Sequence, residues 1–242
     1  MSDEALEQQV LRIWQTRRAR WFYVFLRVVV FVVGRGYLRT QVEGADKLRR
    51  AGAFIVAPVH RSNLDGPLVN ACCPRTVRSL AKREMFAGGL GTWISAMCGS
   101  FPVRRGVGDR RSLQAAISLL ERGEPLLVFP EGTRHSGQQV GDIFGGAAYL
   151  AARAGVPIIP VGIAGTEQAM APKAKFMRPG PVSIVVGEPL VFATGSSTGD
   201  STARRLSADV RAEFTAMLHR AMQDAMDCAY EKASSRLGWR AR

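Results

Sequence analysis

The chain has 242 residues, of which 47% are hydrophobic and 22% charged, as in an ordinary globular protein of one or two domains. This composition excludes disordered and fibrous chains. The net charge of +13 favours an anionic partner such as nucleic acid, a membrane surface or a phosphorylated substrate. The four cysteines have neither zinc-ribbon nor disulfide-framework spacing, which favours a reducing compartment.

The first forty residues differ in composition from the rest. Between Gln8 and Val42 there are seven arginines and no acid, with aromatic and aliphatic residues interleaved. We interpret residues 1–40 as a basic amphipathic helical arm whose guanidinium groups lie among the headgroups of an anionic bilayer. The alternative is a helix buried against the protein's own core.

No apolar run is long enough to predict a transmembrane helix. The longest, Trp21–Val33, has thirteen residues and carries Arg27 in its middle. From an interfacial helix, Arg27 would snorkel to the headgroups. The run is followed by no convincing signal-peptidase site. We therefore expect a peripheral or monotopic membrane protein on the cytoplasmic face of the cell membrane.

From residue 41 onward, short apolar runs alternate with helical stretches. Strands are predicted at Ala53–Val56, Val77–Leu80, Pro125–Phe129, Pro157–Ile163 and Val182–Val186. Helices are predicted at Arg110–Arg122, Gly145–Ala154 and Arg204–Ser234. This alternation predicts an α/β domain over residues 41–242, with a largely parallel or mixed sheet covered by helices. Within it, the run Gly195–Ser201 is expected to be a loop.

His60 follows the first of these strands and precedes Asp65 by five residues. On a straight helix the two side chains would point about 140° apart. If the strand ends at His60 and a helix begins near Asp65, the intervening turn can fold the carboxylate back onto the imidazole. Such a carboxylate orients the ring and leaves its other nitrogen as a general base. The alternative is an aspartate that caps the helix and a histidine that packs.

A second segment, Phe129–Arg134, follows the apolar strand that ends at Val128. The carboxyl end of a buried strand is where open α/β sheets bind ligands. There Arg134 would suit a phosphate and Glu131 could accept a hydrogen bond from a substrate hydroxyl. The alternative is a turn held by an internal pair between Glu131 and Arg134.

Three further cations follow apolar stretches in the same way: Lys82 comes after Val77–Leu80, and Arg104 and Arg105 end the segment Gly99–Arg105. Surface cations are usually only solvated. Three strand ends that deliver cations beside a histidine and two carboxylates instead favour an anion-binding site.

Four blocks in this order make the sequence resemble the glycerolipid acyltransferase family, whose best-known members acylate 1-acylglycerol-3-phosphate. His60 to Asp65 resembles the family's His-x4-Asp motif, and Gly99–Arg105 resembles its second block. Phe129–Arg134 reads Phe-Pro-Glu-Gly-Thr-Arg, as the third block does, and Val156–Val161 resembles the fourth. The resemblance covers roughly Phe54 to Ile163.

The resemblance implies transfer of a fatty acyl group from acyl-CoA or acyl-carrier protein to a lysophospholipid hydroxyl, giving phosphatidic acid. His60 would be the base and Asp65 would orient it. The resemblance places the substrate at Lys82, Arg104, Arg105, Glu131, Gly132, Thr133 and Arg134. It implies no metal and no cofactor, with the acyl thioester as co-substrate. The expected partners are membrane lipids and an anionic bilayer surface.

Other functions stay open at this point. The acceptor could be glycerol-3-phosphate or another lysolipid, or the protein could bind lipid without catalysis. Cys72 and Cys73 could carry an acyl-cysteine intermediate, although no base lies near them in the sequence. We expect no nucleic acid partner, because the basic run is interleaved with apolar residues and no nucleic-acid motif is present.

Overall fold

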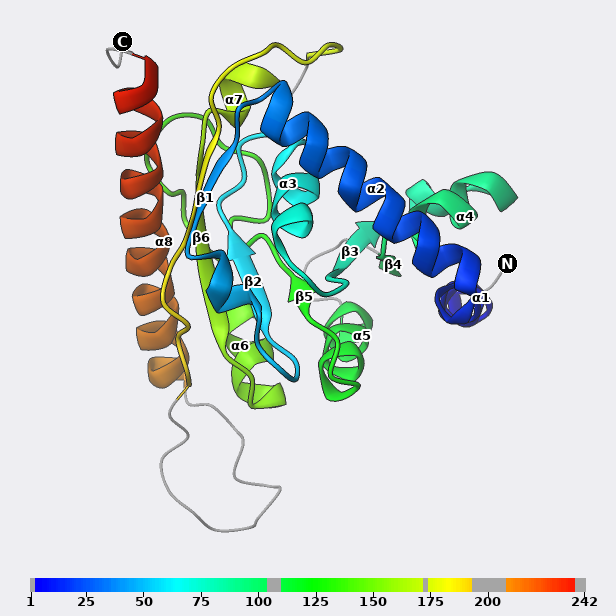
Figure 1. Ribbon diagram of the computed structural model, residues 1–242. Coiled ribbons are helices and arrows are strands. Elements are labelled where there is room, and N and C mark those ends of the chain that lie inside the picture. The colour runs from blue at the N-terminus through cyan, green and yellow to red at the C-terminus, as the bar shows by residue number, and fades with distance from the viewer. Residues whose placement is uncertain (1–2, 104–109, 172–173, 193–207, 238–242) are drawn as a thin grey trace.

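The computed structural model describes residues 3–103, 110–171, 174–192 and 208–237 (Figure 1). Arg104, Arg105 and the run Gly195–Ser201 lie outside these residues. The helices are α1 (Asp3–Gln15), α2 (Arg17–Gly36), α3 (Asp65–Cys72), α4 (Gly88–Met97), α5 (Arg110–Glu121), α6 (Gly146–Ala154), α7 (Thr166–Ala169) and α8 (Ala208–Leu237). The strands are β1 (Gln41–Glu43), β2 (Ile55–Pro58), β3 (Arg78–Lys82), β4 (Ser100–Val103), β5 (Leu126–Leu127), β6 (Ile158–Ala164) and β7 (Ser183–Val186).

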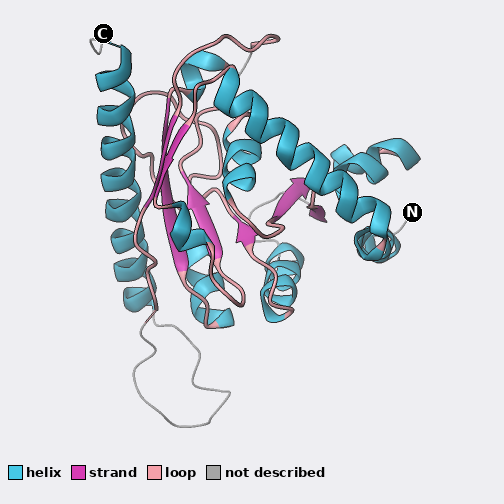
Figure 2. Cartoon of the chain, in the orientation of Figure 1, coloured by secondary structure: helices cyan, strands magenta, loops and turns pink. Residues whose placement is uncertain are grey.

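The strands form one sheet in the order β1-β7-β6-β2-β5-β3-β4. The five strands from β6 to β4 are parallel to one another, whereas β7 pairs antiparallel with β6. The sheet is therefore mixed, which agrees with the prediction of a largely parallel or mixed sheet. β2 and β6 are buried at every position, as expected for central strands covered on both faces. Figure 2 shows the strands at the centre with helices around them.

The chain changes direction within this sheet, and that change positions the site. From β2 it passes through α3 to β3 and then β4, and afterwards it returns through β5 and α6 to β6. Because parallel crossovers are right-handed, α3 and α6 lie on opposite faces of the sheet. The segments that leave the adjacent strands β2 and β5 thus start toward opposite faces of the sheet, and this is the kind of switch point at which open α/β sheets bind ligands.

Helix α8 packs lengthwise against β6 and β7 (Figure 1). The approach is so close that a Cβ placed on Gly162 of β6 would lie 2.1 Å from the backbone of Ala225 in α8. Only glycine fits there without a shift of backbone. The buried side chains of α8, among them Leu218 and Met222, belong to the same hydrophobic core as those of the sheet.

The N-terminal segment is two helices rather than one continuous arm. Thr16 interrupts it with an extended backbone, and its hydroxyl caps α2 by accepting the N–H of Ala19 at 3.2 Å. Both helices pack on the α/β domain, since Leu6 and Val10 of α1 belong to the same core cluster as the sheet and α2 contacts α3. The segment expected as an arm thus lies against the domain.

Arg27 differs from its prediction. Instead of reaching toward headgroups, its guanidinium donates to the carbonyl oxygens of Cys73 (2.9 Å) and Pro74 (2.7 Å), just after α3. These carbonyls follow a helix end, where backbone acceptors lack partners within the helix. Among the described residues, no helix is both long enough and apolar enough to cross a bilayer.

Candidate active site

The His-x4-Asp segment spans the turn between β2 and α3, next to the carboxyl end of the neighbouring strand β5. Strand β2 ends at Pro58, and α3 begins at Asp65 itself. Within the turn, the carboxylate Oδ2 of Asp65 accepts the backbone N–H groups of Arg61 (2.6 Å) and Ser62 (2.7 Å). Hydrogen bonds to a charged acceptor stabilise by about 1.5–3 kcal/mol each. These two hydrogen bonds hold the turn in the conformation predicted from the sequence, with the carboxylate folded back toward the imidazole.

The same oxygen of Asp65 lies 3.1 Å from Nδ1 of His60. A carboxylate can only accept, so Nδ1 carries the proton and Nε2 is left as an acceptor. Asp65 is fully buried, whereas the His60 side chain is 20% exposed. This is the arrangement of an oriented general base that a substrate can reach.

Phe129, two residues after the end of β5, packs on a face of the imidazole. Its ring stacks on His60 with a centroid separation of 3.8 Å and an interplanar angle of 20°. The ring of His60 is thus held at its edge by Asp65 and on one face by Phe129. Restricting the ring in this way aims Nε2 without help from substrate.

Glu131 is placed differently from its prediction. It is only 2% exposed, and both carboxylate oxygens bind protein groups. Oε2 accepts the backbone N–H of His60 at 2.7 Å, Oε1 accepts that of Gly141 at 2.9 Å, and the guanidinium of Arg61 donates to both. Glu131 therefore connects the β2 and β5 loops, and its oxygens do not face a substrate hydroxyl.

Arg61 is the site residue that the sequence did not identify. It is 1% exposed, and besides Glu131 it donates to the carbonyls of His60, Gly137 and Gln139. The internal ion pair considered for the third block thus exists, but with Arg61 in place of Arg134. Its ionic partner Glu131 lies 70 residues away along the chain, so no local spacing reveals the pair.

The tip of the β5 loop exposes Gly132, Thr133 and Arg134. Gly132 has φ +69°, and a Cβ there would meet the Phe144 ring at 2.9 Å, so the turn requires glycine. Arg134 donates to the side-chain oxygen of Asn63 at 2.8 Å. Since Asn63 belongs to the His60–Asp65 turn, Arg134 lies beside the dyad with its guanidinium at the surface.

The remaining predicted cations follow two neighbouring strands. Lys82 is the last residue of β3, and it pairs in register with Val103, the last residue of β4. Arg104 and Arg105 come next in the chain and lie outside the described residues, as does the side chain of Lys82. The backbone thus brings Lys82 to the same edge of the sheet as His60.

The cysteine pair does not have the environment of a nucleophile. Burial raises the pKa of Cys72 to about 12, and that of Cys73 is raised by burial as well. The Cys72 thiol also donates to the carbonyl of Leu68. Because thiolate is the reactive form, an acyl-cysteine at this position is disfavoured. Among the described residues, no group of three histidine, cysteine or acidic side chains could hold a metal ion.

The chain is similar in sequence to known acyltransferases. A family model described as Acyltransferase matches residues 39–164. The 1-acyl-sn-glycerol-3-phosphate acyltransferase of Streptococcus pneumoniae is 33% identical over 147 residues, covering 59% of this chain and 54% of the relative. The lyso-ornithine lipid O-acyltransferase of Pseudomonas aeruginosa is 38% identical over 118 residues, which cover 47% of this chain and 45% of that relative. The chain spans about half the length of these curated relatives.

A solved structure gives the same fold. The crystal structure of the 1-acyl-sn-glycerophosphate acyltransferase PlsC from Thermotoga maritima superimposes with a TM-score of 0.66 at 23% identity, covering 97% of this chain and 90% of that one. The family match spans the whole segment from β1 to β6, including the His60–Asp65 turn and the Glu131–Arg134 loop. The chain belongs to the acyltransferase family.

Proposed function

We propose that this protein transfers a fatty acyl group from an acyl thioester to the hydroxyl of a lysophospholipid, with 1-acylglycerol-3-phosphate as the acceptor and phosphatidic acid as the product. The observation that carries the proposal is the 3.1 Å contact between Asp65 and Nδ1 of His60, which leaves Nε2 as an oriented base. Relatives named for acylation of 1-acyl-sn-glycerol-3-phosphate support the choice of acceptor.

In this reaction the acceptor hydroxyl attacks the thioester carbonyl while Nε2 of His60 takes the hydroxyl proton. The tetrahedral intermediate then collapses, the carbon–sulfur bond breaks, and His60 returns the proton to the departing thiol. Asp65 keeps the ring oriented and stabilises its charged form between the two steps. A positioned base of this kind contributes roughly 10²–10⁴-fold to the rate.

The acceptor phosphate would bind the cations at the same edge of the sheet. Arg134 is the best placed, because it is exposed and its contact with Asn63 holds it beside the dyad. Lys82, Arg104 and Arg105 would add positive charge from the ends of β3 and β4. A guanidinium gives a phosphate paired hydrogen bonds, so Arg134 would fix the acceptor relative to His60.

We also propose that the protein works at a membrane surface, on the cytoplasmic side where thioester donors arrive from water. The outer face of α2 supports this, since Trp21, Phe25 and Val32 are 73%, 62% and 60% exposed. Helix α4 continues the apolar face with Leu90 (71% exposed), and Phe22 contacts Trp93 at 5.6 Å between ring centroids. A contiguous patch of solvent-exposed apolar side chains is typical of a surface that contacts lipid or another protein.

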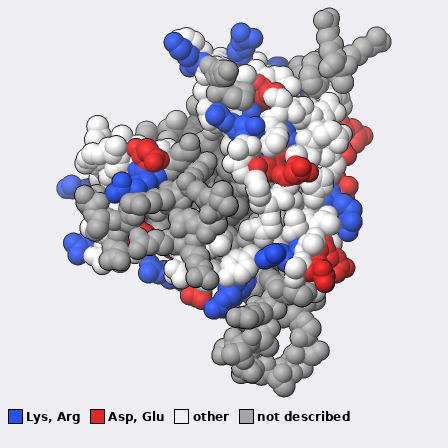
Figure 3. All heavy atoms as spheres, turned by 180° about the vertical axis from the view of Figure 1, so that it is seen from behind, with Lys and Arg blue, Asp and Glu red and all other residues white. Residues whose placement is uncertain are grey.

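Nucleic acid binding has less support. On the face shown in Figure 3, acidic and basic side chains are interspersed over the described surface. A nucleic acid footprint on this face would require a continuous basic stripe.

The experiment that tests the function is acyl transfer by the purified full chain with one labelled acyl-CoA and a panel of acceptors. The panel contains 1-acylglycerol-3-phosphate, glycerol-3-phosphate, a lyso-ornithine lipid and monoacylglycerol. The proposal predicts the highest kcat/KM with 1-acylglycerol-3-phosphate. If another acceptor were preferred, acyl transfer would remain the proposed reaction, but 1-acylglycerol-3-phosphate would no longer be the proposed substrate. Absence of transfer to every acceptor, from both acyl-CoA and acyl-carrier protein, would favour a non-catalytic lipid-binding protein.

A further inference from the structure

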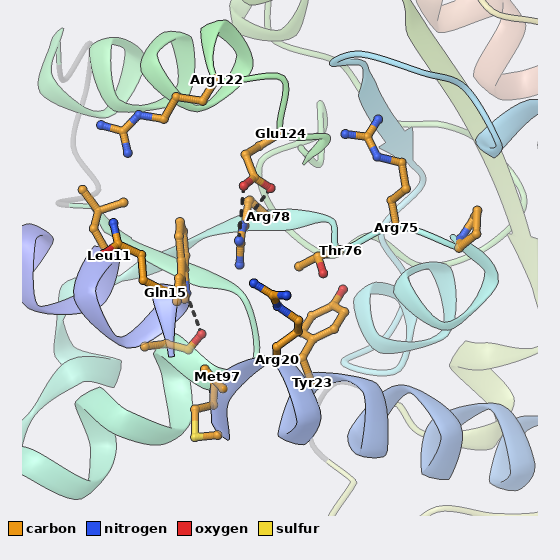
Figure 4. A pocket seen from close by; sticks show the side chains of 14 residues that line it. Leu11, Gln15, Arg20, Tyr23, Arg75, Thr76, Arg78, Met97, Arg122 and Glu124 are labelled. Atoms are coloured by element: carbon orange, nitrogen blue, oxygen red, sulfur yellow. Dashed lines mark hydrogen bonds and ion pairs between the residues drawn. The ribbon is translucent and has the colours of Figure 1, made fainter. Parts of the chain in front are cut away.

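A cavity of about 580 Å³ lies at the edge of the sheet opposite to the active site (Figure 4). Its lining comes from α1, α2, the end of α4, the turn into β3 and the segment that follows α5. β3 enters the sheet here, at Arg78, whereas His60 and Arg134 follow the carboxyl ends of strands. The cavity is therefore a separate place from the acyl-transfer site.

The lining has a strong excess of positive charge. It contains the four arginines Arg20, Arg75, Arg78 and Arg122 but only one acid, Glu124. Glu124 is engaged by Arg78, at 3.2 and 3.4 Å. The other guanidinium groups have no carboxylate in the lining to balance them.

The arginines differ in how they are held. Arg75 is fixed to the wall, because its guanidinium donates to the carbonyls of Gly52 and Gly123. Arg20 and Arg122 are exposed, and within the described part of the chain their guanidinium groups have no hydrogen-bond or ion-pair partner. These two are available to bind an anion.

Neutral donors and an apolar wall complete the cavity. Tyr23 and Thr76 lie next to Arg20 in Figure 4, and the Tyr23 oxygen accepts the N–H of Val77 at 3.2 Å. Burial raises the pKa of Tyr23, so its hydroxyl keeps the proton and remains a donor. Trp14 forms a wall, with the Arg78 guanidinium 3.7 Å from its ring centroid.

We propose that this cavity binds a phosphate-bearing anion, through Arg20 and Arg122, independently of acyl transfer at His60. Several arginine donors around one space suit the oxygens of a phosphate group. The group can belong to a lipid headgroup or to a free phosphate. Arg20 lies next to Trp21, which projects from the apolar face of α2, so a headgroup could enter while its chains follow that face.

The test is arginine labelling by phenylglyoxal in the full wild-type chain, followed residue by residue by mass spectrometry. The probes are inorganic phosphate and the short-chain lipid dihexanoyl phosphatidic acid. Arg12 of α1 and Arg18 of α2 serve as controls, because both are exposed on helices that line the cavity but are not themselves lining residues. At ten times the dissociation constant, labelling of Arg20 and Arg122 should slow about tenfold, and that of the controls less than about twofold.

Protection by both probes supports recognition of the phosphate group itself, and protection by the lipid alone supports a headgroup as the source. No protection, or equal protection of all four arginines, would overturn the proposal. Titration of the protecting probe into Arg20→Ala/Arg122→Ala and Arg12→Ala/Arg18→Ala compares variants of equal net charge. Weaker binding of the probe only to Arg20→Ala/Arg122→Ala supports the site. Equal weakening in both double variants would overturn it, because the probe would then respond only to the net charge of the protein. Since His60 is unchanged in both variants, failure here leaves the proposed reaction untouched.

Discussion

The arginines of this chain have contrasting environments at the active-site loops and in the N-terminal helices. Arg61 is buried beside His60, and its donors bind Glu131 and backbone carbonyls. Arg12, Arg18 and Arg20 on α1 and α2 are exposed. These three exposed arginines are therefore available to external partners, whereas the single buried Arg61 organises the catalytic loops. A buried guanidinium is retained only when it is paired, so the difference follows from desolvation.

Among variants that leave His60 in place, Asp65→Asn should have the largest effect. An amide cannot accept from Nδ1 and from two backbone N–H groups as a carboxylate does, so His60 loses its tautomer and orientation. We expect kcat to fall by roughly 10²–10⁴-fold, while the KM for the acceptor stays close to that of wild type. Steady-state kinetics measures both. A variant with a raised KM and an unchanged kcat would assign Asp65 to binding instead.

Glu131→Gln tests whether the buried pair is structural. Removing one partner leaves the Arg61 charge buried and unpaired, so the free energy of unfolding should fall by about 3–5 kcal/mol. Urea denaturation measures this change. The matched control is Glu124→Gln, whose pair with Arg78 is partly exposed and should contribute about 1 kcal/mol or less. Wild-type stability combined with a raised KM for the acceptor would restore Glu131 as a substrate contact.

Arg134→Ala sharpens the contrast, because Arg134 is the arginine of these loops that remains exposed. Loss of charge-assisted hydrogen bonds should reduce kcat/KM for 1-acylglycerol-3-phosphate about 10–100-fold, and that for monoacylglycerol far less. Equal losses with both acceptors would show that Arg134 acts through the loop. Asn63→Ala provides the control, since it removes only the contact between the two loops.

Trp21→Ala/Phe25→Ala tests the apolar face of α2. Both side chains are exposed, so the variant should fold normally while its partition onto anionic vesicles falls about tenfold or more. Flotation measures the bound fraction. Val210→Ala/Met217→Ala removes exposed apolar side chains from α8 instead and should bind as wild type does. Equal loss in both variants would contradict a membrane face on α2. Deletion of residues 1–36 is a poorer test, because it removes Leu6 and Val10 from the core.

The sequence predicted the parts of this molecule that local patterns specify. The runs at Pro157–Ile163 and Gly145–Ala154 correspond to β6 and α6. Both could be predicted, because a long apolar run or a long helical pattern specifies its element locally. The three-residue strand β1 and the antiparallel direction of β7 escaped prediction, since both depend on pairing between distant segments. Helix α4 was also missed, because its glycines have low helix propensity.

The same division applies to the site. The His60–Asp65 contact was predictable, because both residues lie in one turn whose length sets the geometry. The stacking of Phe129 on His60 and the pairing of Arg61 with Glu131 were not, because each joins two loops that only the sheet brings together. Glu131 illustrates the limit. Its place in the segment Phe129–Arg134 predicted a functional residue, but only the structure shows that it is buried and that its carboxylate binds other groups of the protein.

The most direct test of the central claim is the acyl-transfer rate of folded His60→Ala. Because Nε2 of His60 is the proposed base, transfer from acyl-CoA to 1-acylglycerol-3-phosphate should fall by at least about 10²-fold. Circular dichroism and acceptor binding should match those of wild type, and His219→Ala, on α8, should retain full activity. Near-normal turnover by well-folded His60→Ala protein would contradict the account.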